Sequence, residues 1–320
     1  ADTEVPVADA RAVCAKASAA CQIVEVPGAS HRLENWWPSQ WDYKNDLLRA
    51  VASHVGTVPP AVRTAALGSG LRKRIVYDPA AKLTLDAWVP SGTAPHAAVV
   101  LVHGGGWEAG DRVTYIAPMF ALAASHGLAW ISIDYRLTPG VTVADQIADV
   151  SRALAWLRQH PGELRIDPAR LVLVGESASG HLVARAAASE PGLAGVVSFY
   201  GVYDLDAMAG DPANPRSLAR RLLGITALDD AARARLREFS PVHHASKSLP
   251  PMLLVAGTAD RLVGQQRAYV KALRSAGAQV EAIEIAGAPH GMEAWHDEPA
   301  WKTWPSRVMP WIVEVIGEPR

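Results

Sequence analysis

Short apolar runs recur along the chain from residue 97 onward, and they constrain the fold more than any other feature. They cover residues 97–102, 128–133, 171–174, 195–200, 252–256 and 280–285. Runs of this length without polar alternation are typical of strands buried on both faces of a sheet. Between two of them, apolar residues recur at helical spacing: Ile147, Val150, Leu154 and Leu157. Alternating strands and helices predict an α/β domain with a mostly parallel sheet flanked by helices.

An antiparallel pair and a helical insertion extend this pattern. Residues 74–77 and 83–89 flank a turn-forming Asp-Pro stretch, so we expect them to pair as the first two strands. An insertion at about 204–249 follows the sixth predicted strand, and residues 217–238 within it are rich in Arg and Leu at helical spacing. We expect the insertion to overhang the carboxyl edge of the sheet, where open α/β sheets bind ligands.

The first seventy residues differ in character, with a tryptophan-rich cluster at 35–41 and a later stretch rich in Gly and Pro. We expect residues 1–70 to form an N-terminal extension, partly helical, that packs on or caps the main domain. Residues 71–320 would then form that domain, including the insertion. Whether the tryptophans of the extension anchor it or line a cleft stays open.

The two cysteines, Cys14 and Cys21, both lie in this extension. In one continuous helix their Cα atoms would lie about 10.5 Å apart, so a disulfide requires a break in the helix between them. Two cysteines and a first residue, Ala1, that is not methionine favour an exported, secreted or periplasmic protein with this disulfide. Two free thiols and a cytoplasmic location remain open alternatives.

The charge balance argues against two classes of partner. Thirty-one Lys and Arg residues face 32 Asp and Glu residues, which gives a formal net charge of −1. Such a chain has no long-range field to attract nucleic acid or an anionic membrane. No apolar run approaches the roughly 18 residues of a membrane span. We therefore expect no nucleic-acid partner and no transmembrane segment.

A strand, a tight turn and a helix at residues 172–186 carry the strongest chemical signal. The turn reads Gly-Glu-Ser-Ala-Ser-Gly at 175–180. A turn of small residues forces its central serine into a strained backbone conformation and lifts the hydroxyl clear of the sheet. Ser177 is therefore predicted to be a nucleophile, which needs a base at neutral pH. Ser179 stands where the strict Gly-x-Ser-x-Gly pattern has its second glycine.

Three consecutive glycines lie between His103 and Trp107, directly after the run at 97–102. Without side chains, their backbone N–H groups can point at an oxygen that becomes anionic in a transition state. A phosphate-binding loop would need a following Lys-Ser/Thr pair or a Gly-x-Gly-x-x-Gly motif that opens a helix, and neither is present. We therefore expect an oxyanion hole.

Asp260 and His290 each follow an apolar run closely. Because carboxyl ends of parallel strands meet at one edge of a sheet, we expect both side chains near Ser177, in the chain order Ser, Asp, His. Such an arrangement supplies a base and a carboxylate that orients it. Three other histidines compete for the base role but follow no strand as closely: His243, His244 and His296.

These motifs resemble the α/β-hydrolase superfamily, in the branch related to hormone-sensitive lipase that includes bacterial feruloyl-esterase-like and acetyl-esterase-like carboxylesterases. The likeness covers residues 72–318, and its motifs lie at 103–107, 134–137, 175–180, 257–260 and 289–292. It implies an eight-stranded sheet and ester hydrolysis without cofactor or metal. It assigns catalysis to Ser177, Asp260 and His290, and oxyanion binding to the N–H groups of Gly105, Gly106 and Ala178.

The bond cleaved and the substrate are less constrained. We expect a short-acyl or aromatic carboxylic ester, as a small molecule or on a plant polysaccharide, contacted by Trp107 and Glu176. Aryl formamidases share the architecture but usually carry an aromatic residue inside the glycine motif, where this chain has three glycines. A non-catalytic binding module on the same fold typically lacks the serine or the histidine, whereas both are present here.

Overall fold

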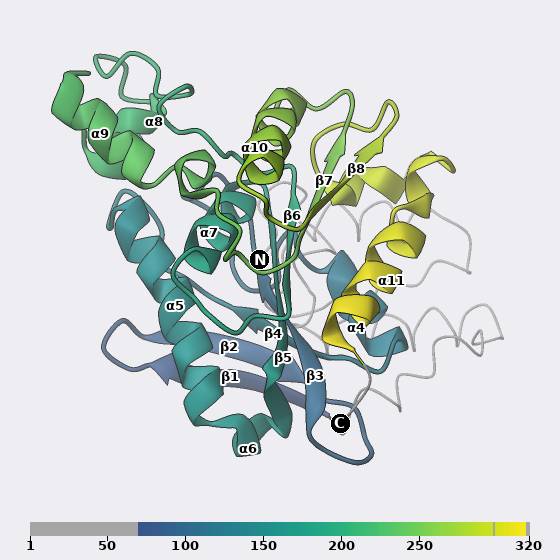
Figure 1. Ribbon diagram of the computed structural model, residues 1–320. Helices are drawn as coiled ribbons and strands as arrows, with labels where there is room; N and C mark the ends of the chain where they lie inside the picture. Colours follow the sequence, from purple (N-terminus) through teal and green to yellow (C-terminus); the bar gives the residue numbers. More distant parts are fainter. Residues whose placement is uncertain (1–69, 297, 318–320) are drawn as a thin grey trace, which may run out of the picture. The chain divides into compact units, whose positions relative to one another are not determined.

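The computed structural model describes residues 70–296 and 298–317 (Figure 1). The chain divides between Ser69 and Gly70. The predicted extension, together with Cys14 and Cys21, lies outside the described residues except for Gly70. Among the helices that are described, none is long and apolar enough to span a bilayer.

An eight-stranded sheet forms the centre of the described part of the chain. Its strands are β1 (Leu71–Asp78), β2 (Leu83–Trp88), β3 (His96–Val102), β4 (Ala129–Ile133), β5 (Ile166–Glu176), β6 (Gly195–Phe199), β7 (Met252–Gly257) and β8 (Val280–Ile285). Their order across the sheet is β1-β2-β4-β3-β5-β6-β7-β8. Strand β2 runs antiparallel to both of its neighbours, and every other pair is parallel. The mostly parallel α/β sheet that the sequence predicts is confirmed.

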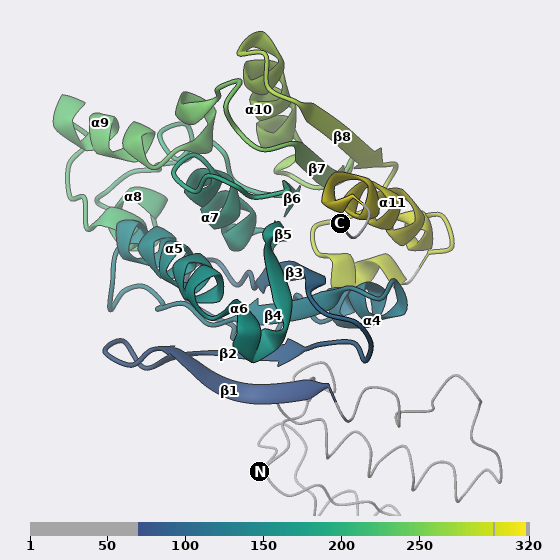
Figure 2. The same ribbon diagram turned by 60° about the horizontal axis from the view of Figure 1, so that its bottom comes forward.

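Helices cover both faces of this sheet (Figures 1 and 2). One face carries α5 (Val143–Gln159), α7 (Ala178–Ala187) and α10 (Val263–Ser275), and the other carries α4 (Pro118–Ser125) and α11 (Pro305–Ile316). The short helices α6 (Pro161–Leu164), η4 (Met292–His296) and η5 (Trp301–Thr303) lie in connections. The apolar side of α5 is buried as its spacing predicts, at Val150, Leu154 and Leu157.

The insertion between β6 and β7 contains α8 (Leu218–Leu223), α9 (Asp230–Glu238) and the short helix η3 (Pro241–His244). The helical spacing at 217–238 thus yields two helices instead of one continuous helix. Gly224 ends α8 in the left-handed region (φ 64°), and Asp229 caps α9 by accepting the Ala232 N–H. Buried leucines on both helices, among them Leu222 and Leu236, pack the insertion onto the domain.

Strand β5, which leads to Ser177, is longer than the predicted run at 171–174. It starts at Ile166, opposite His96, but its regular pairing with β3 begins only where Leu171 meets Ala98. The intervening residues bulge out of the ladder, since five positions on β5 correspond to two on β3. The regular part, from Leu171 to Glu176, is buried throughout. This rigid central strand positions the turn that follows it.

Candidate active site

Ser177 occupies a strained turn between β5 and α7. Its backbone angles are φ 56° and ψ −117°, a region that side-chain-bearing residues rarely adopt. The turn is tight enough that a Cβ on Gly175 would lie 2.4 Å from the Ser179 carbonyl oxygen. The Ser177 N–H donates to the Phe199 carbonyl at 2.9 Å, which fixes the turn against β6. The half-buried serine therefore presents its hydroxyl at the carboxyl edge of the sheet.

Ser179, which replaces the second glycine of the strict motif, is fully buried. Its Oγ accepts the Glu176 N–H at 2.8 Å and lies 2.7 Å from the Val102 carbonyl oxygen, to which it donates. Val102 is the last residue of β3, immediately before the glycine motif. The hydroxyl therefore joins the serine turn to the end of the neighbouring strand, and it has a partner for both donor and acceptor.

The structure brings Ser177, His290 and Asp260 into one hydrogen-bonded chain. His290 Nδ1 lies 2.6 Å from Asp260 Oδ2, and His290 Nε2 lies 2.9 Å from Ser177 Oγ. A carboxylate can only accept, so Nδ1 carries the proton and the neutral ring accepts the serine hydroxyl at Nε2. The Asp260 side chain is fully buried, and its other oxygen accepts the Leu262 N–H at 2.8 Å. The arrangement can remove a proton from Ser177.

Residues 286–291, which we call the His290 loop, rest on a group of aromatic side chains. The Tyr200 ring packs edge-on against His290 with centroids 4.7 Å apart, and its hydroxyl accepts the Met292 N–H at 2.8 Å. Trp295 packs against Tyr200 and donates its indole N–H to the Pro289 carbonyl at 2.9 Å. Phe199 and Trp304 complete the group, which we call the aromatic cluster: Phe199, Tyr200, Trp295 and Trp304.

Among the described side chains, neither His243 nor His244 forms a hydrogen bond with Ser177. His243 and His244 lie in η3 of the insertion, as expected, and the His244 Nε2 donates to the Glu238 carbonyl at 2.7 Å. The side chain of His296 lies outside what the structure describes. His290 is thus the histidine that contacts the serine hydroxyl.

Every backbone carbonyl of residues 103–107, the glycine loop, accepts a hydrogen bond. In order along the loop, the donors are the Tyr135 hydroxyl at 2.9 Å, the His103 Nδ1 at 2.8 Å, the Ala109 N–H at 3.0 Å, the Arg221 guanidinium at 2.9 Å and the Thr138 N–H at 3.0 Å. A trans peptide is planar and directs its N–H opposite to its C=O. Held carbonyls therefore fix where the N–H groups of the loop point.

The three N–H groups that the resemblance assigns to oxyanion binding are uncommitted. Among the described residues, those of Gly105, Gly106 and Ala178 donate to no hydrogen bond. Gly105 has φ 105° and no space for a side chain, since a Cβ there would lie 2.1 Å from the Ala109 carbonyl oxygen. Ala178 begins α7, and a helix N-terminus favours negative charge. These groups are suited to stabilising an oxyanion.

Trp107 and Glu176, the predicted substrate contacts, are both buried, at 4% and 3% exposure. The Trp107 indole lies in the hydrophobic core and donates its N–H to His181 Nδ1 at 3.3 Å. A Glu176 carboxylate oxygen accepts the Gly104 N–H at 2.6 Å. Both side chains therefore brace the glycine loop, and substrate contact by either of them stays a prediction that their burial weakens.

Sequence reasoning missed three residues that support the site: His181, Tyr200 and Arg221. His181 lies one helical turn after Ser177 on α7, and its spacing could have placed it on the same helix face. Burial lowers the pKa of His181 to about 4, so the ring is neutral at neutral pH. Tyr200 and Arg221 come from distant segments, and no pattern in the sequence links them to the site.

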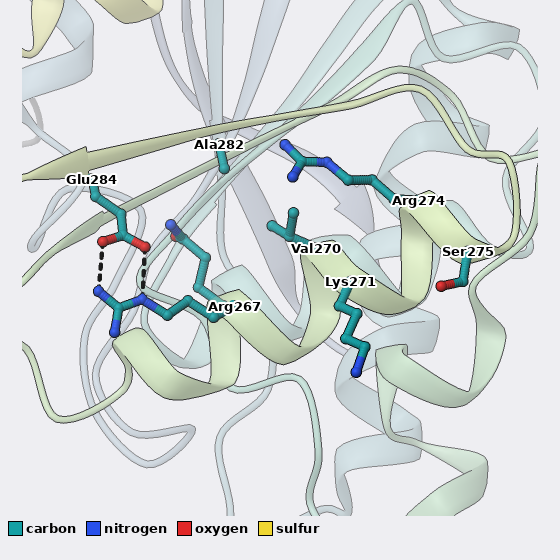
Figure 3. A pocket seen from close by; sticks show the side chains of 8 residues that line it. Arg267, Val270, Lys271, Arg274, Ser275, Ala282 and Glu284 are labelled. Carbon is teal, nitrogen blue, oxygen red and sulfur yellow. Dashed lines mark hydrogen bonds and ion pairs between the residues drawn. The ribbon is translucent and has the colours of Figure 1, made fainter.

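A surface groove between α10 and β8 is separate from this site (Figure 3). Its volume is about 430 Å³, and an ion pair between Arg267 and Glu284 lies at one end. None of the predicted site residues lines it. Within the described ranges, no cluster of three or more His, Cys, Asp or Glu side chains could hold a metal ion.

The strand order, the serine turn after β5 and the acid and base after β7 and β8 together define an α/β-hydrolase fold. A solved truncated carbohydrate esterase from gut microbiota shares this fold. It is 21% identical, with a TM-score of 0.66 over 78% of this chain and 96% of that chain. The chain belongs to the BD-FAE family, whose model matches residues 85–273. The resemblance inferred from the motifs is confirmed at the level of the family.

Two relatives have esterase names. The probable carboxylic ester hydrolase LipM of Mycobacterium tuberculosis is 33% identical over 207 residues, which cover 59% of this chain and 47% of LipM. Thermogutta terrifontis esterase 2 phosphorylated by paraoxon is 27% identical, with a TM-score of 0.63 over 78% of this chain and 96% of that one. The same esterase has also been solved with butyrate bound. The chain spans about half the length of the curated relatives it matches.

Proposed function

We propose that this chain is a serine carboxylesterase that hydrolyses short-acyl esters through an acyl-enzyme on Ser177. The observation that carries the proposal is the hydrogen-bonded chain from Asp260 through His290 to Ser177 Oγ. Membership of the BD-FAE family and the esterase names of the relatives support it.

In the first half-reaction, Ser177 Oγ attacks the ester carbonyl carbon while His290 Nε2 takes the hydroxyl proton. Asp260 holds the ring with Nδ1 protonated and stabilises its charged form. The carbonyl oxygen becomes an oxyanion, which the N–H groups of Gly105, Gly106 and Ala178 stabilise. Each such donor contributes about 10²–10³ in rate. The intermediate collapses as His290 returns the proton to the leaving alcohol oxygen.

In the second half-reaction, water attacks the acyl-enzyme. His290 removes a proton from the water, the same N–H groups stabilise the second oxyanion, and Ser177 leaves with the proton from His290. The products are the free acid and the regenerated serine. No redox step or added group is needed, so atoms and charges balance between ester, water, acid and alcohol.

The acyl group is proposed to be short. Support comes from Thermogutta terrifontis esterase 2, which has been solved with propionate and with butyrate bound. Turnover of p-nitrophenyl acetate, butyrate and decanoate, together with methyl ferulate, would place the preference. We expect acetate or butyrate to be preferred, and a preference for decanoate would overturn the short-acyl assignment.

The test of the chemistry is Ser177→Ala beside Ser189→Ala, an exposed serine just beyond the end of α7. Ser177→Ala should lower kcat for p-nitrophenyl butyrate by about 10⁴ or more without changing Tm, because the nucleophile is lost and the fold is not. Ser189→Ala should match the wild type. Intact-mass spectrometry should detect one paraoxon-derived group on the wild type and none on Ser177→Ala. Full turnover by Ser177→Ala would refute the proposal.

The formamidase alternative is decided in the same assay. An N-formyl aromatic amine offers a formamide carbonyl in place of an ester carbonyl. We expect p-nitrophenyl acetate to give the higher kcat/KM, because an alcohol is the better leaving group. A kcat/KM for the formamide that exceeds the ester value would assign the chain to amide hydrolysis instead.

A further inference from the structure

The insertion reaches the glycine loop at two separate points. At the first, Arg221 from α8 contacts the loop directly; we call this contact the guanidinium tether. At the second, His181 bridges the loop to the residue that follows α9; we call this contact the imidazole tether. Neither contact includes a member of the Ser177, His290 and Asp260 chain.

The guanidinium tether is a fork that holds two groups at once. Arg221 Nη2 donates to the Gly106 carbonyl at 2.9 Å, and Arg221 Nε donates to Glu108 Oε1 at 2.6 Å. Nη2 also lies 2.6 Å from Glu108 Oε2, so the carboxylate is bound bidentately. The Glu108 N–H in turn lies 3.2 Å from the Gly105 carbonyl. One guanidinium therefore restrains the carbonyl of Gly106 directly and the turn at Gly105 through Glu108.

The imidazole tether runs through the core. Trp107 donates its indole N–H to His181 Nδ1 at 3.3 Å, and His181 Nε2 donates to the Phe239 carbonyl at 2.7 Å. Both rings are buried, and they pack edge-to-face with centroids 5.6 Å apart. Phe239 is the C-cap of α9 in the insertion. The residue that follows Gly106 is therefore attached to the far end of the same insertion.

We propose that Arg221 and His181 are positioning residues through which the insertion holds the glycine loop and sets the direction of its Gly106 N–H donor. The inference rests on the proposed esterase function. A held carbonyl sets the direction of the N–H in its own peptide, which belongs to the next residue, so the Gly106 N–H follows the Gly105 carbonyl. Arg221 reaches that carbonyl through Glu108, whose carboxylate it binds and whose N–H donates to the Gly105 carbonyl at 3.2 Å. Oxyanion donors act only when they are already aimed at the place where charge develops.

This role predicts a particular kinetic pattern. The donors stabilise the transition state more than bound ester, so misdirecting them lowers kcat and leaves KM unchanged. A residue that merely held the substrate would raise KM instead. A residue needed only for folding would lower Tm and active enzyme concentration, with no change in kcat per labelled Ser177.

The experiment uses Arg221→Ala, Arg221→Lys and the control Arg220→Ala, with active sites counted by paraoxon labelling. Arg220 is the preceding arginine of α8; it is exposed and donates to the Pro212 carbonyl at 3.4 Å, away from the loop. With p-nitrophenyl butyrate, Arg221→Ala should lower kcat about tenfold or more, with KM within twofold of wild type. Arg221→Lys should restore only part of kcat, because an ammonium cannot form the fork. Arg220→Ala should match the wild type.

A trifluoromethyl ketone gives a second readout, since its adduct with a serine places an oxyanion on the donors. Its inhibition constant should rise for Arg221→Ala by the same factor as kcat/KM falls. His181→Leu removes both the acceptor for the Trp107 indole and the donor to the Phe239 carbonyl. It should lower kcat in the same way, with KM unchanged.

The outcomes separate the two proposals. A wild type that neither hydrolyses esters nor reacts with paraoxon would remove the proposed function itself. An active wild type whose Arg221→Ala variant keeps the kcat of Arg220→Ala would overturn the positioning role. A change in KM alone would also overturn it, because Arg221 would then contact substrate. An inhibition constant of the trifluoromethyl ketone that is unchanged in Arg221→Ala would likewise overturn the positioning role.

Discussion

The two loops that supply the two halves of the site are both hydrogen-bonded, but they differ in the other contacts that hold them. The glycine loop is held by hydrogen bonds and an ion pair, several of them donated by distant segments. The His290 loop is also hydrogen-bonded, for example from the Gly287 N–H to Thr258 Oγ1 at 2.8 Å and from the Trp295 indole to the Pro289 carbonyl at 2.9 Å, but it rests in addition on the aromatic cluster. Hydrogen bonds are directional and therefore fix the orientation of the N–H groups in the glycine loop. Aromatic packing restrains the position of the His290 ring.

This difference separates the conditions to which each loop responds. Aromatic packing depends on buried area and hardly changes with salt or mild acid. The contacts of the glycine loop include a buried imidazole and a partly exposed ion pair, which respond to pH and to ionic strength. The contacts of the glycine loop should therefore weaken with changes in pH or salt. The packing of the His290 loop should be sensitive to substitutions that change the volume of the core.

The largest effect should come from truncating the aromatic cluster. Trp304 is 1% exposed and packs against Phe199 and Trp295. Trp304→Ala should lower the free energy of unfolding by about 3–5 kcal/mol, since it leaves a large cavity. Urea denaturation measures the loss, with Trp156→Ala, a half-buried tryptophan on α5, as the control that loses less. A change below about 1 kcal/mol would mean that the cluster does not contribute to stability as its burial predicts.

The second-largest effect should be a loss of stability in acid, caused by His181 behind the glycine loop. Burial lowers the pKa of His181 from 6.5 to about 4, so below pH 6.5 the unfolded chain binds a proton that the folded chain does not. The free energy of unfolding should therefore fall as the pH is lowered from 6.5 to 4, by roughly 3 kcal/mol from this residue. Denaturation curves of wild type and His181→Gln between pH 7 and 4 measure this. Identical pH slopes for the two proteins would contradict the assignment.

The smallest effect should come from salt. The Arg221 and Glu108 side chains are 24% and 38% exposed, and pairs of this kind contribute about 0.2–1 kcal/mol. Sodium chloride at about 1 M should therefore lower kcat only two- to threefold, by screening the fork. Arg221→Ala, which has no fork to screen, should show no such response. Equal salt sensitivity of kcat in both proteins would mean that the salt effect does not arise from the ion pair between Arg221 and Glu108.

The juxtaposition of Ser177, Asp260 and His290 could be predicted because carboxyl ends of parallel strands share one edge, and each residue follows its strand closely. The bracing contacts could not. Arg221 meets Gly106 across 115 positions, and its helix reads as an ordinary charged helix in the sequence. Because Trp107 adjoins the glycines, the sequence predicts that its side chain contacts substrate. Its backbone is left-handed there (φ 66°), and its ring packs in the core.

Ser179 shows what the serine turn requires of its fifth position. The hydroxyl fits beneath the end of β3 because the Val102 carbonyl and the Glu176 N–H both lie within its reach. The position thus requires a small residue, and a polar one must find hydrogen-bond partners nearby. Glycine is one residue that satisfies this requirement, and serine is another. Genome searches that insist on glycine there would overlook chains built like this one, and a pattern that also admits serine would recover them.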